Sequence, residues 1–228
     1  HCLLYTDREN RIVTVSVPDG AKTVVATCPE AEFRGVNWSP DSQWITYTRP
    51  ASNEMSVVYV RNLSSGEEIA VTQKWYDATS PLFSADGRYL LFNATQDLNP
   101  TYSQVEWNYA YTNMGALYMA LLSRDGVSPF LPADGETPKP EPAASEPKTA
   151  GKDRKTESGK KADKPVVKVD ADGLQERIIK IPAGTGWLRP VFGDEKGFWF
   201  AGRGGIQYFD FAKKEATQVV DGGMSVSG

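Results

Sequence analysis

The chain has 228 residues, of which 40% are hydrophobic and 24% charged, with a formal net charge of −4 and a pI near 5.2. This acidic balance, with no stripe of Lys and Arg interleaved with aromatic residues, argues against a nucleic-acid partner and favours proteins or peptides. The longest apolar stretch, 115–122, is much shorter than the roughly 20 residues that cross a bilayer, so no membrane insertion is predicted.

The N-terminal part of the chain predicts three short strands, at 3–6, 11–17 and 22–27, which would belong to one partial sheet. Cys2 and Cys28 fall at the two outer strands, with a third strand between them at about 4.8 Å per step, beyond the usual Cα reach of a disulfide. We therefore predict that both are buried free thiols.

An internal repeat follows. Residues 36–48 and 81–93 superimpose without a gap at an offset of 45 residues, from Asp41 to Asp86 (86 − 41 = 45). Each copy has an aromatic residue, a turn rich in Ser and Asp, and a strand of aromatic and β-branched residues. A unit of roughly 40 to 45 residues with several short strands is typical of a β-propeller blade, which buries its faces by stacking on neighbours.

The predicted fold is therefore all-β, a β-propeller segment of four-stranded antiparallel blades, about three of them complete and others partial. Because the chain begins and ends within a blade, we expect an excerpt of a longer protein. The alternative is a closed four-bladed ring, in which 224–227 pairs beside 3–6. The predicted blades cover 1–28 (partial), 33–73, 80–131 together with 166–182, 187–221, and 224–228 (the start of another).

Residues 132–165 are different in composition. They include six Pro and fifteen charged residues, but no aromatic residue and no Val, Ile, Leu or Met. Such a segment cannot offset the entropy lost on ordering, so we predict a disordered low-complexity insertion. It would separate the third strand of its blade, 117–122, from the fourth, 177–182. A docking role for an acidic partner is the alternative to a purely solvated loop.

Three further runs carry a family resemblance: DLNPTYSQVEW at 97–107, LYMALL at 117–122 followed by SPF, and VDADGLQERI at 169–178. In this order, with a charged insertion between the second and third, they resemble the propeller region of the tricorn protease family. The repeat is also similar to the blades of TolB and of propeller-bearing serine peptidases. The tricorn resemblance implies a seven-bladed propeller, preceded by a six-bladed one and followed by a PDZ domain and two catalytic domains.

This resemblance implies that the chain is the noncatalytic propeller portion of a serine peptidase, channelling or gating peptides toward a C-terminal catalytic domain and scaffolding it. The implied partners are peptides and the catalytic and PDZ domains of the same chain, with a homo-oligomer left open. The implied location is cytoplasmic, with a periplasmic one left open. The alternatives are a TolB-like interaction propeller without enzymatic activity and the propeller of an oligopeptidase-type α/β-hydrolase.

Within the chain itself, no catalytic residue, cofactor site or metal site is predicted. The single histidine is His1, so a Ser/His relay would lack a base. Ser225 lies in a Gly-Met-Ser-Val-Ser run that lacks the last Gly of a nucleophile elbow. Four carboxylates recur at predicted turns and are interpreted as turn formers: Asp41, Asp86, Asp172 and Asp194.

The candidate contact surface is the long loop 97–107 between the second and third strands of its blade, because such a loop projects from the rim of a propeller. Its alternative role is to fold over its own blade, burying aromatic side chains. A separate arginine in the 169–178 run is expected to pair with Asp170 or Asp172, or to bind a ligand. The proposed peptide or domain contacts are Asp97, Asn99, Tyr102, Glu106, Trp107 and Arg177.

The composition of the insertion leads to a first test. Replacing 132–165 by a short Gly/Ser linker should change the free energy of unfolding by less than about 1 kcal/mol, because a loop without apolar anchors contributes mainly closure entropy. Urea denaturation of the two chains measures the difference. A loss of several kcal/mol would mean that the insertion packs against the blades.

Overall fold

The computed structural model describes residues 2–97, 100–102, 109–111, 114–130 and 165–221. The predicted insertion 132–165, apart from its last residue, lies outside these residues. The same holds for the predicted blade start at 224–228 and for the pairing of 224–227 that a closed ring would need.

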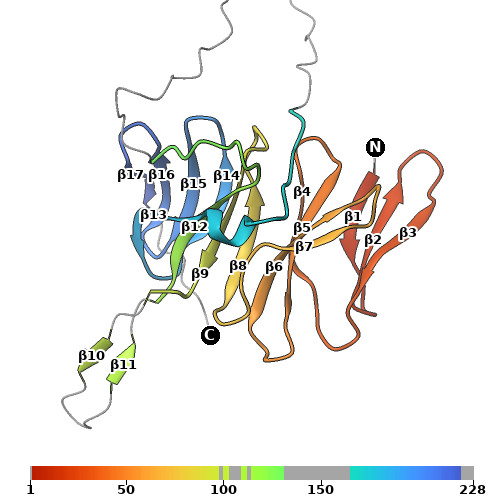
Figure 1. Cartoon of the computed structure of the whole chain (residues 1–228), viewed down its shortest axis with the longest axis horizontal. Helices are drawn as coiled ribbons and strands as arrows, with labels where there is room; N and C mark the ends of the chain where they lie inside the picture. The colour runs from red at the N-terminus through yellow and green to blue at the C-terminus, as the bar shows by residue number, and fades with distance from the viewer. Residues whose placement is uncertain (1, 98–99, 103–108, 112–113, 131–164, 222–228) are drawn as a thin grey trace, which may run out of the picture.

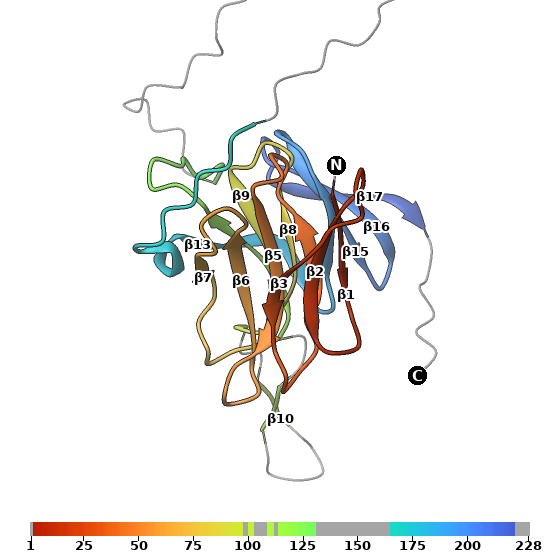
Figure 2. The ribbon, with the colours of Figure 1, turned by 90° about the vertical axis from the view of Figure 1, so that its right-hand side faces the viewer.

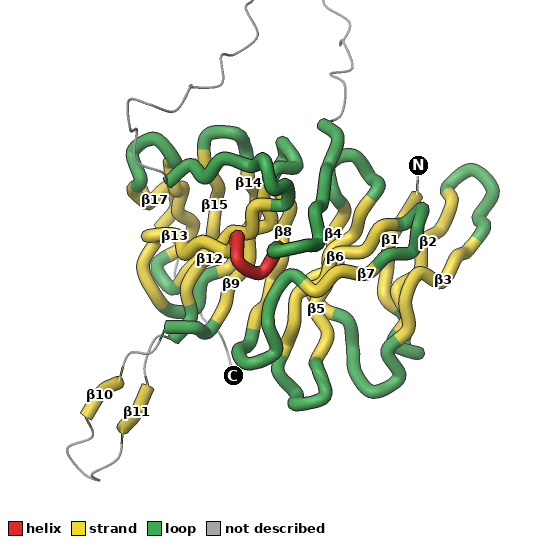
Figure 3. The backbone as a smooth tube through the Cα atoms, viewed as in Figure 1, coloured by secondary structure: helices red, strands yellow, loops and turns green. Residues whose placement is uncertain are grey.

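The described strands form four antiparallel sheets that stand in a row, with a small two-stranded hairpin beside them (Figure 1). Three sheets have four strands and the first has three. One 3₁₀ helix, η1, adds the single helical turn in the described part of the chain (Figure 3). The first sheet contains β1 (Cys2–Thr6), β2 (Arg11–Ser16) and β3 (Lys22–Thr27). The second contains β4 (Arg34–Trp38), β5 (Trp44–Pro50), β6 (Ser56–Asn62) and β7 (Glu68–Ala70).

The third sheet has the order β13-β12-β9-β8, and the fourth β14-β15-β16-β17. The third sheet contains β8 (Ala78–Phe83), β9 (Tyr89–Ala94), β12 (Ala116–Leu121) and β13 (Ile178–Thr185). The fourth contains β14 (Arg189–Gly193), β15 (Gly197–Gly202), β16 (Gly205–Asp210) and β17 (Glu215–Asp221). The hairpin is β10 (Pro100–Tyr102) with β11 (Tyr109–Tyr111), and η1 spans Leu174–Arg177.

These sheets confirm the predicted fold class. They do not close into a ring, because the first and fourth sheets stand at opposite ends of the row (Figure 1). Seen from the side, the sheets overlap face to face, as the blades of a propeller do (Figure 2). The described architecture is therefore a partial propeller.

The middle strands are buried on both faces because each lies between two neighbouring sheets. In β9, Leu90 and Phe92 pack into the core between the second and third sheets, whereas Tyr89 and Leu91 pack into the core between the third and fourth. A strand alternates its side chains between faces, so a continuous apolar run fills two cores at once. Ile45 of β5 fills a third core, between the first and second sheets.

The repeated Ser and Asp residues explain the tight turns between first and second strands. The buried hydroxyl of Ser39 accepts a hydrogen bond from the Trp44 backbone N–H at 2.9 Å. Asp41 accepts one from the Gln43 N–H at 3.0 Å, and thereby holds the turn. The second copy repeats both bonds with Ser84 and Asp86 in place of Ser39 and Asp41. The interpretation of these two carboxylates as turn formers is confirmed.

Residues 165–177, which we call the strap, cross from the second sheet to the third. The Val167 N–H donates to Asp41 Oδ2 at 2.8 Å, and the Val167 side chain is buried in the core between those sheets. Leu174 is buried in the same core. Gln175 extends its Nε2 toward the carbonyl oxygens of Ala70 and Thr72, each at 3.5 Å. The strap therefore joins the two sheets before β13 completes the third.

The cysteine prediction is only partly right. Cys2 and Cys28 are both free, and Cys28 is buried as expected. Cys2, however, is exposed. It lies on β1, in a sheet that has a neighbour on one side only in the described part of the chain, so the strand is covered much less than the middle strands of the second and third sheets.

The strap offers a stability test with a matched control. Val167→Ala should destabilise the fold by about 1 to 3 kcal/mol, since it removes buried methyl groups and leaves a cavity. Val166→Ala should change stability by less than about 0.5 kcal/mol, because Val166 is 87% exposed. Denaturant midpoints and slopes of both variants give the comparison, and equal losses would contradict the role given to the strap.

Candidate functional site

The inner strands of the sheets define where a central axis would run. Among the described residues, β4 contacts β8, and β8 contacts β14, although these strands belong to three different sheets. Each of the three is the terminal strand of its sheet. Sheets that meet along such strands and diverge outward have the geometry of propeller blades, so β4, β8 and β14 face the axis.

All three inner strands are irregular at equivalent places. The pairing register shifts between Arg34 and Asn37 in β4, between Thr79 and Leu82 in β8, and between Pro190 and Phe192 in β14. A β-bulge leaves extra residues unpaired and redirects the strand locally. The first two bulges lie one repeat apart, since Gly35 and Ser80 are separated by the same 45 residues (80 − 35 = 45). Both residues have positive φ, 61° and 55°.

These bulges surround a pocket of about 360 Å³, which opens between the inner strands.

We call it the axial pocket. Its lining comes entirely from the three inner strands: Gly35 and Asn37 of β4, Ser80, Pro81 and Leu82 of β8, and Arg189, Pro190 and Val191 of β14. The exposed side chains there include Arg189 and Val191, so a charged and an apolar group lie side by side. The axial pocket thus combines strand edges with one charged and one apolar side chain that are exposed.

Asn37 fixes the spacing of β4 and β8 at this point. Its Nδ2 donates to the Pro81 carbonyl oxygen at 3.0 Å and to the Gly35 carbonyl oxygen at 3.2 Å. The backbone at Gly35 comes so close to β8 that an added Cβ would stand 2.8 Å from Pro81 Cδ. The wall of the axial pocket is therefore held by a direct contact between neighbouring sheets.

The axial pocket suits transient contact with an extended peptide. A terminal strand presents backbone N–H and C=O groups that no further strand of its sheet takes up, and an extended chain can bind them. Pro81 and Pro190 lack the N–H, which prevents a continuous ladder from forming. We find no acid and base poised for catalysis here, since Arg189 is the sole ionisable residue among those that line the axial pocket.

The predicted contact residue Asp97 lies away from the axis. Its carboxylate forms an ion pair with Lys180 Nζ at 2.5 Å and accepts a hydrogen bond from the Tyr118 hydroxyl at 3.4 Å. Burial and the Asp97 carboxylate together raise the pKa of Tyr118 to about 12. The Asp97 N–H also donates to the Met114 carbonyl oxygen at 3.2 Å. Asp97 therefore anchors the base of the segment that carries β10 and β11.

The rest of the predicted loop is partly described. Tyr102 pairs with Tyr109 in the β10–β11 hairpin, which projects from the third sheet (Figure 1). Asn99, Glu106 and Trp107 lie outside the described residues. A contact between this hairpin and a peptide or domain stays a prediction.

Arg177 is used within the fold. Its guanidinium donates to four backbone carbonyl oxygens, which belong to Leu121 (3.0 Å), Leu122 (3.4 Å), Asp170 (2.5 Å) and Asp172 (2.7 Å). The expected partners were the carboxylates of the two aspartates, but those bind other groups, including Lys168 and Arg124. Arg177 therefore locks the turn before β13, and a ligand-binding role stays a prediction.

The comparison with family models decides the relationship. Residues 1–227 match the tricorn protease second β-propeller domain. The chain belongs to this family. The resemblance carried by the runs at 97–107, 117–122 and 169–178 is thereby confirmed.

Individual tricorn relatives are distant and much longer. The chain is 26% identical over 205 residues to a protein of Sulfurisphaera tokodaii named as a tricorn-like protease C-terminal subunit, covering 84% of this chain and 21% of that protein. It is 24% identical over 174 residues to tricorn protease homolog 1 of Streptomyces coelicolor, covering 76% and 15%. The chain thus spans about a fifth or less of the length of these relatives.

Solved structures support the fold of this tricorn-family propeller. The crystal structure of the tricorn protease superimposes with a TM-score of 0.70 at 17% identity, covering 96% of this chain and 21% of that one. TolB from Acinetobacter baumannii gives a TM-score of 0.55 at 14% identity, covering 96% and 41%. At such identities both likenesses show the fold alone.

Among the described residues of this propeller, no group of three or more His, Cys, Asp or Glu residues could hold a metal ion. No helix in the same residues has the length and apolar character needed to cross a membrane.

The close approach of β4 to β8 leads to a test on glycines. Gly35→Ala should destabilise the fold by about 1 to 3 kcal/mol more than Gly20→Ala, because only at Gly35 does the new Cβ meet Pro81. Both glycines have positive φ, 61° and 69°, so the backbone strain of alanine is shared and cancels in the comparison. Urea denaturation of the two variants measures the difference, and equal destabilisation would count against a tight β4–β8 contact.

Proposed function

We propose that this chain is the noncatalytic propeller portion of a tricorn-like serine peptidase, where it channels or gates peptides toward a C-terminal catalytic domain and scaffolds that domain. The observation that carries the proposal is the axial pocket, where the bulges of β4, β8 and β14 come together. Membership of the tricorn propeller family supports the peptidase context.

The chemistry of the axial pocket suits the passage of a peptide better than it suits a catalytic centre. Strand edges interrupted by proline offer an extended peptide several weak contacts and no long ladder, so the peptide can be guided and released. Arg189 can attract carboxylates without fixing one residue type. The sequence has one histidine, His1, which leaves a serine nucleophile in this chain without an evident base.

The proposed partners are peptides together with the catalytic and PDZ domains of the same polypeptide, and an assembly of several copies is left open. We place the parent protein in the cytoplasm, as an extension of the family resemblance. Neither nucleic acid nor membrane insertion belongs to the proposal.

The function can be tested by narrowing the axial pocket in the full-length protein. Val191→Trp should lower kcat/KM for a peptide of ten or so residues by about tenfold, because an extended chain has to pass the added ring. A single-residue amide substrate should be hydrolysed almost as before. Both substrates are assayed with the same preparation, and the measured quantity is the ratio of kcat/KM for the peptide to kcat/KM for the amide.

Val220→Trp is the matched control. Val220 is 50% exposed and Val191 is 43% exposed, but Val220 lies on β17, at the other edge of the same sheet. The control should leave both activities unchanged. Equal losses for the two variants, or a loss in neither, would remove the support for passage along the axis.

A further inference from the structure

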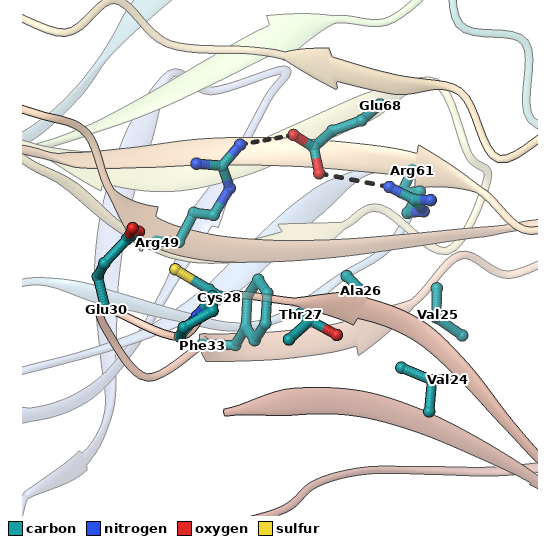
Figure 4. A pocket seen from close by; sticks show the side chains of 11 residues that line it. Val24, Val25, Ala26, Thr27, Cys28, Glu30, Phe33, Arg49, Arg61 and Glu68 are labelled. Atoms are coloured by element: carbon teal, nitrogen blue, oxygen red, sulfur yellow. Dashed lines mark hydrogen bonds and ion pairs between the residues drawn. The ribbon is translucent and has the colours of Figure 1, made fainter. Parts of the chain in front are cut away.

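A second pocket lies where the first and second sheets meet, away from the axis. Its volume is about 410 Å³, and none of its lining residues belongs to the axial pocket (Figure 4). One wall is the segment Val24–Thr27 of β3, and the opposite wall carries Arg49, Arg61 and Glu68 from β5, β6 and β7. We call it the junction pocket.

Three charged side chains meet on the second-sheet wall. Arg49 Nη2 lies 2.7 Å from Glu68 Oε1, and Arg61 Nη1 lies 3.5 Å from Glu68 Oε2 (Figure 4). The Tyr47 hydroxyl also donates to Glu68 Oε2. Burial opposes the ionisation of Glu68, but the hydrogen bonds from Tyr47 and Arg49 keep the pKa of its carboxyl below the usual value.

The two arginines have bonding capacity that Glu68 does not use. A guanidinium has five N–H donors, and here each arginine reaches Glu68 through a single nitrogen. Both carboxylate oxygens of Glu68 already accept hydrogen bonds, from Tyr47 and Arg49, so Glu68 has little capacity to accept more. The remaining donors belong to planar groups that recognise carboxylates in a bidentate manner.

The arginines are held in position by packing. Arg49 stacks over the Tyr59 ring, with its Cζ 4.3 Å from the ring centroid. The side chains of Arg49 and Arg61 are only 30% and 25% exposed. A partly desolvated and preorganised guanidinium loses less entropy on binding an anion than a mobile surface arginine does.

The opposite wall favours a peptide over a small inorganic anion. β3 is the terminal strand of the first sheet, so its residues Val24–Thr27 offer a strand edge to the junction pocket. An extended peptide can bind such an edge through its backbone. Glu30, also in the lining, is exposed and would disfavour an anion that lies near it. A suitable ligand therefore carries its carboxylate at the Arg49–Arg61 side.

We propose that the junction pocket binds an extended peptide segment through a carboxylate, either a peptide C-terminus or an acidic side chain, with Arg49 and Arg61 as its anchors. This site is separate from the axial pocket and does not depend on the function proposed there. Glu68 occupies part of the same guanidinium surface, so it limits the affinity for the ligand.

The test uses three fluorescently labelled tetrapeptides and the full-length protein, treated with a serine-directed inhibitor so that no probe is cut. One probe is Ala-Ala-Glu-Ala amide, one is Ala-Ala-Gln-Ala amide, and one is Ala-Ala-Gln-Ala with a free C-terminus. We expect at least one carboxylate probe to bind about tenfold more tightly than the neutral amide, as a charge-assisted bidentate contact implies. The two carboxylate probes distinguish a side chain from a C-terminus.

Variants assign the binding to this pocket. Arg61→Gln should abolish the preference for the carboxylate probe, and Arg61→Lys should retain part of it. Arg88→Gln is the matched control and should have no effect. Arg88 also pairs with a carboxylate, Asp86, at 2.5 Å and lies near an aromatic ring, but it belongs to the turn between β8 and β9, away from the junction pocket. Fluorescence anisotropy measures each affinity.

Glu68→Gln is expected to increase the affinity for the carboxylate probe, a result that a misfolded variant would not produce. It removes the competing internal carboxylate and should tighten binding of the carboxylate probe by about threefold to tenfold. Three results would overturn the proposal: equal binding of all probes, equal losses for Arg61→Gln and Arg88→Gln, or weaker binding in Glu68→Gln with the fold intact by circular dichroism.

Discussion

The burial of the middle strands on both faces is the constraint on which the rest of the structure depends. In β12, Tyr118 and Ala120 pack into the core shared with the second sheet, whereas Leu117 and Met119 pack into the core shared with the fourth. A single sheet with this sequence would expose one of its two apolar faces, so each sheet requires a neighbour. The inner strands approach closely at Gly35 and Pro81, and the sheets therefore converge at the axis. The propeller geometry follows from these two requirements.

A stack of this kind also has to satisfy polar groups where strands end. The hydroxyls of Ser39 and Ser84 are buried and bonded to the backbone across their turns. Arg177 also satisfies polar groups, in the third sheet. Its guanidinium donates hydrogen bonds to backbone carbonyl oxygens that a continuous hairpin would have paired with backbone N–H groups. The strap completes the arrangement, because Val167 brings an apolar side chain and a backbone bond to the junction of two sheets.

The strands and turns of the repeat could be predicted from the sequence, whereas the features that depend on contacts between sheets could not. The offset of 45 residues between Asp41 and Asp86 was enough to predict the strands β5 and β9 and their turns, because local residue types decide them. The bulges at Gly35 and Ser80 were not predicted, although a glycine followed one repeat later by Ser-Pro was a usable signal for an irregular edge. The cluster around Glu68 draws on three strands, and neither spacing nor composition brings Arg49 and Arg61 to it. The exposure of Cys2 likewise depends on the neighbours of its sheet, which strand periodicity does not show.

The same constraint decides where this fold can carry out a function. The apolar side chains of the middle strands are taken up by packing between sheets, so a ligand has access only to strand edges and to the junctions where sheets meet. The axial pocket is such a place at the inner edges, and its three bulges keep β4, β8 and β14 from forming regular pairing surfaces. The junction pocket is the corresponding place between the first and second sheets, where Arg49 of β5 and Arg61 of β6 lie on the wall opposite β3. Since the sheets diverge outward, the junction pocket has space for long side chains that the core could not contain. The charged ends of such side chains can lie beside the apolar core without disturbing how the core packs.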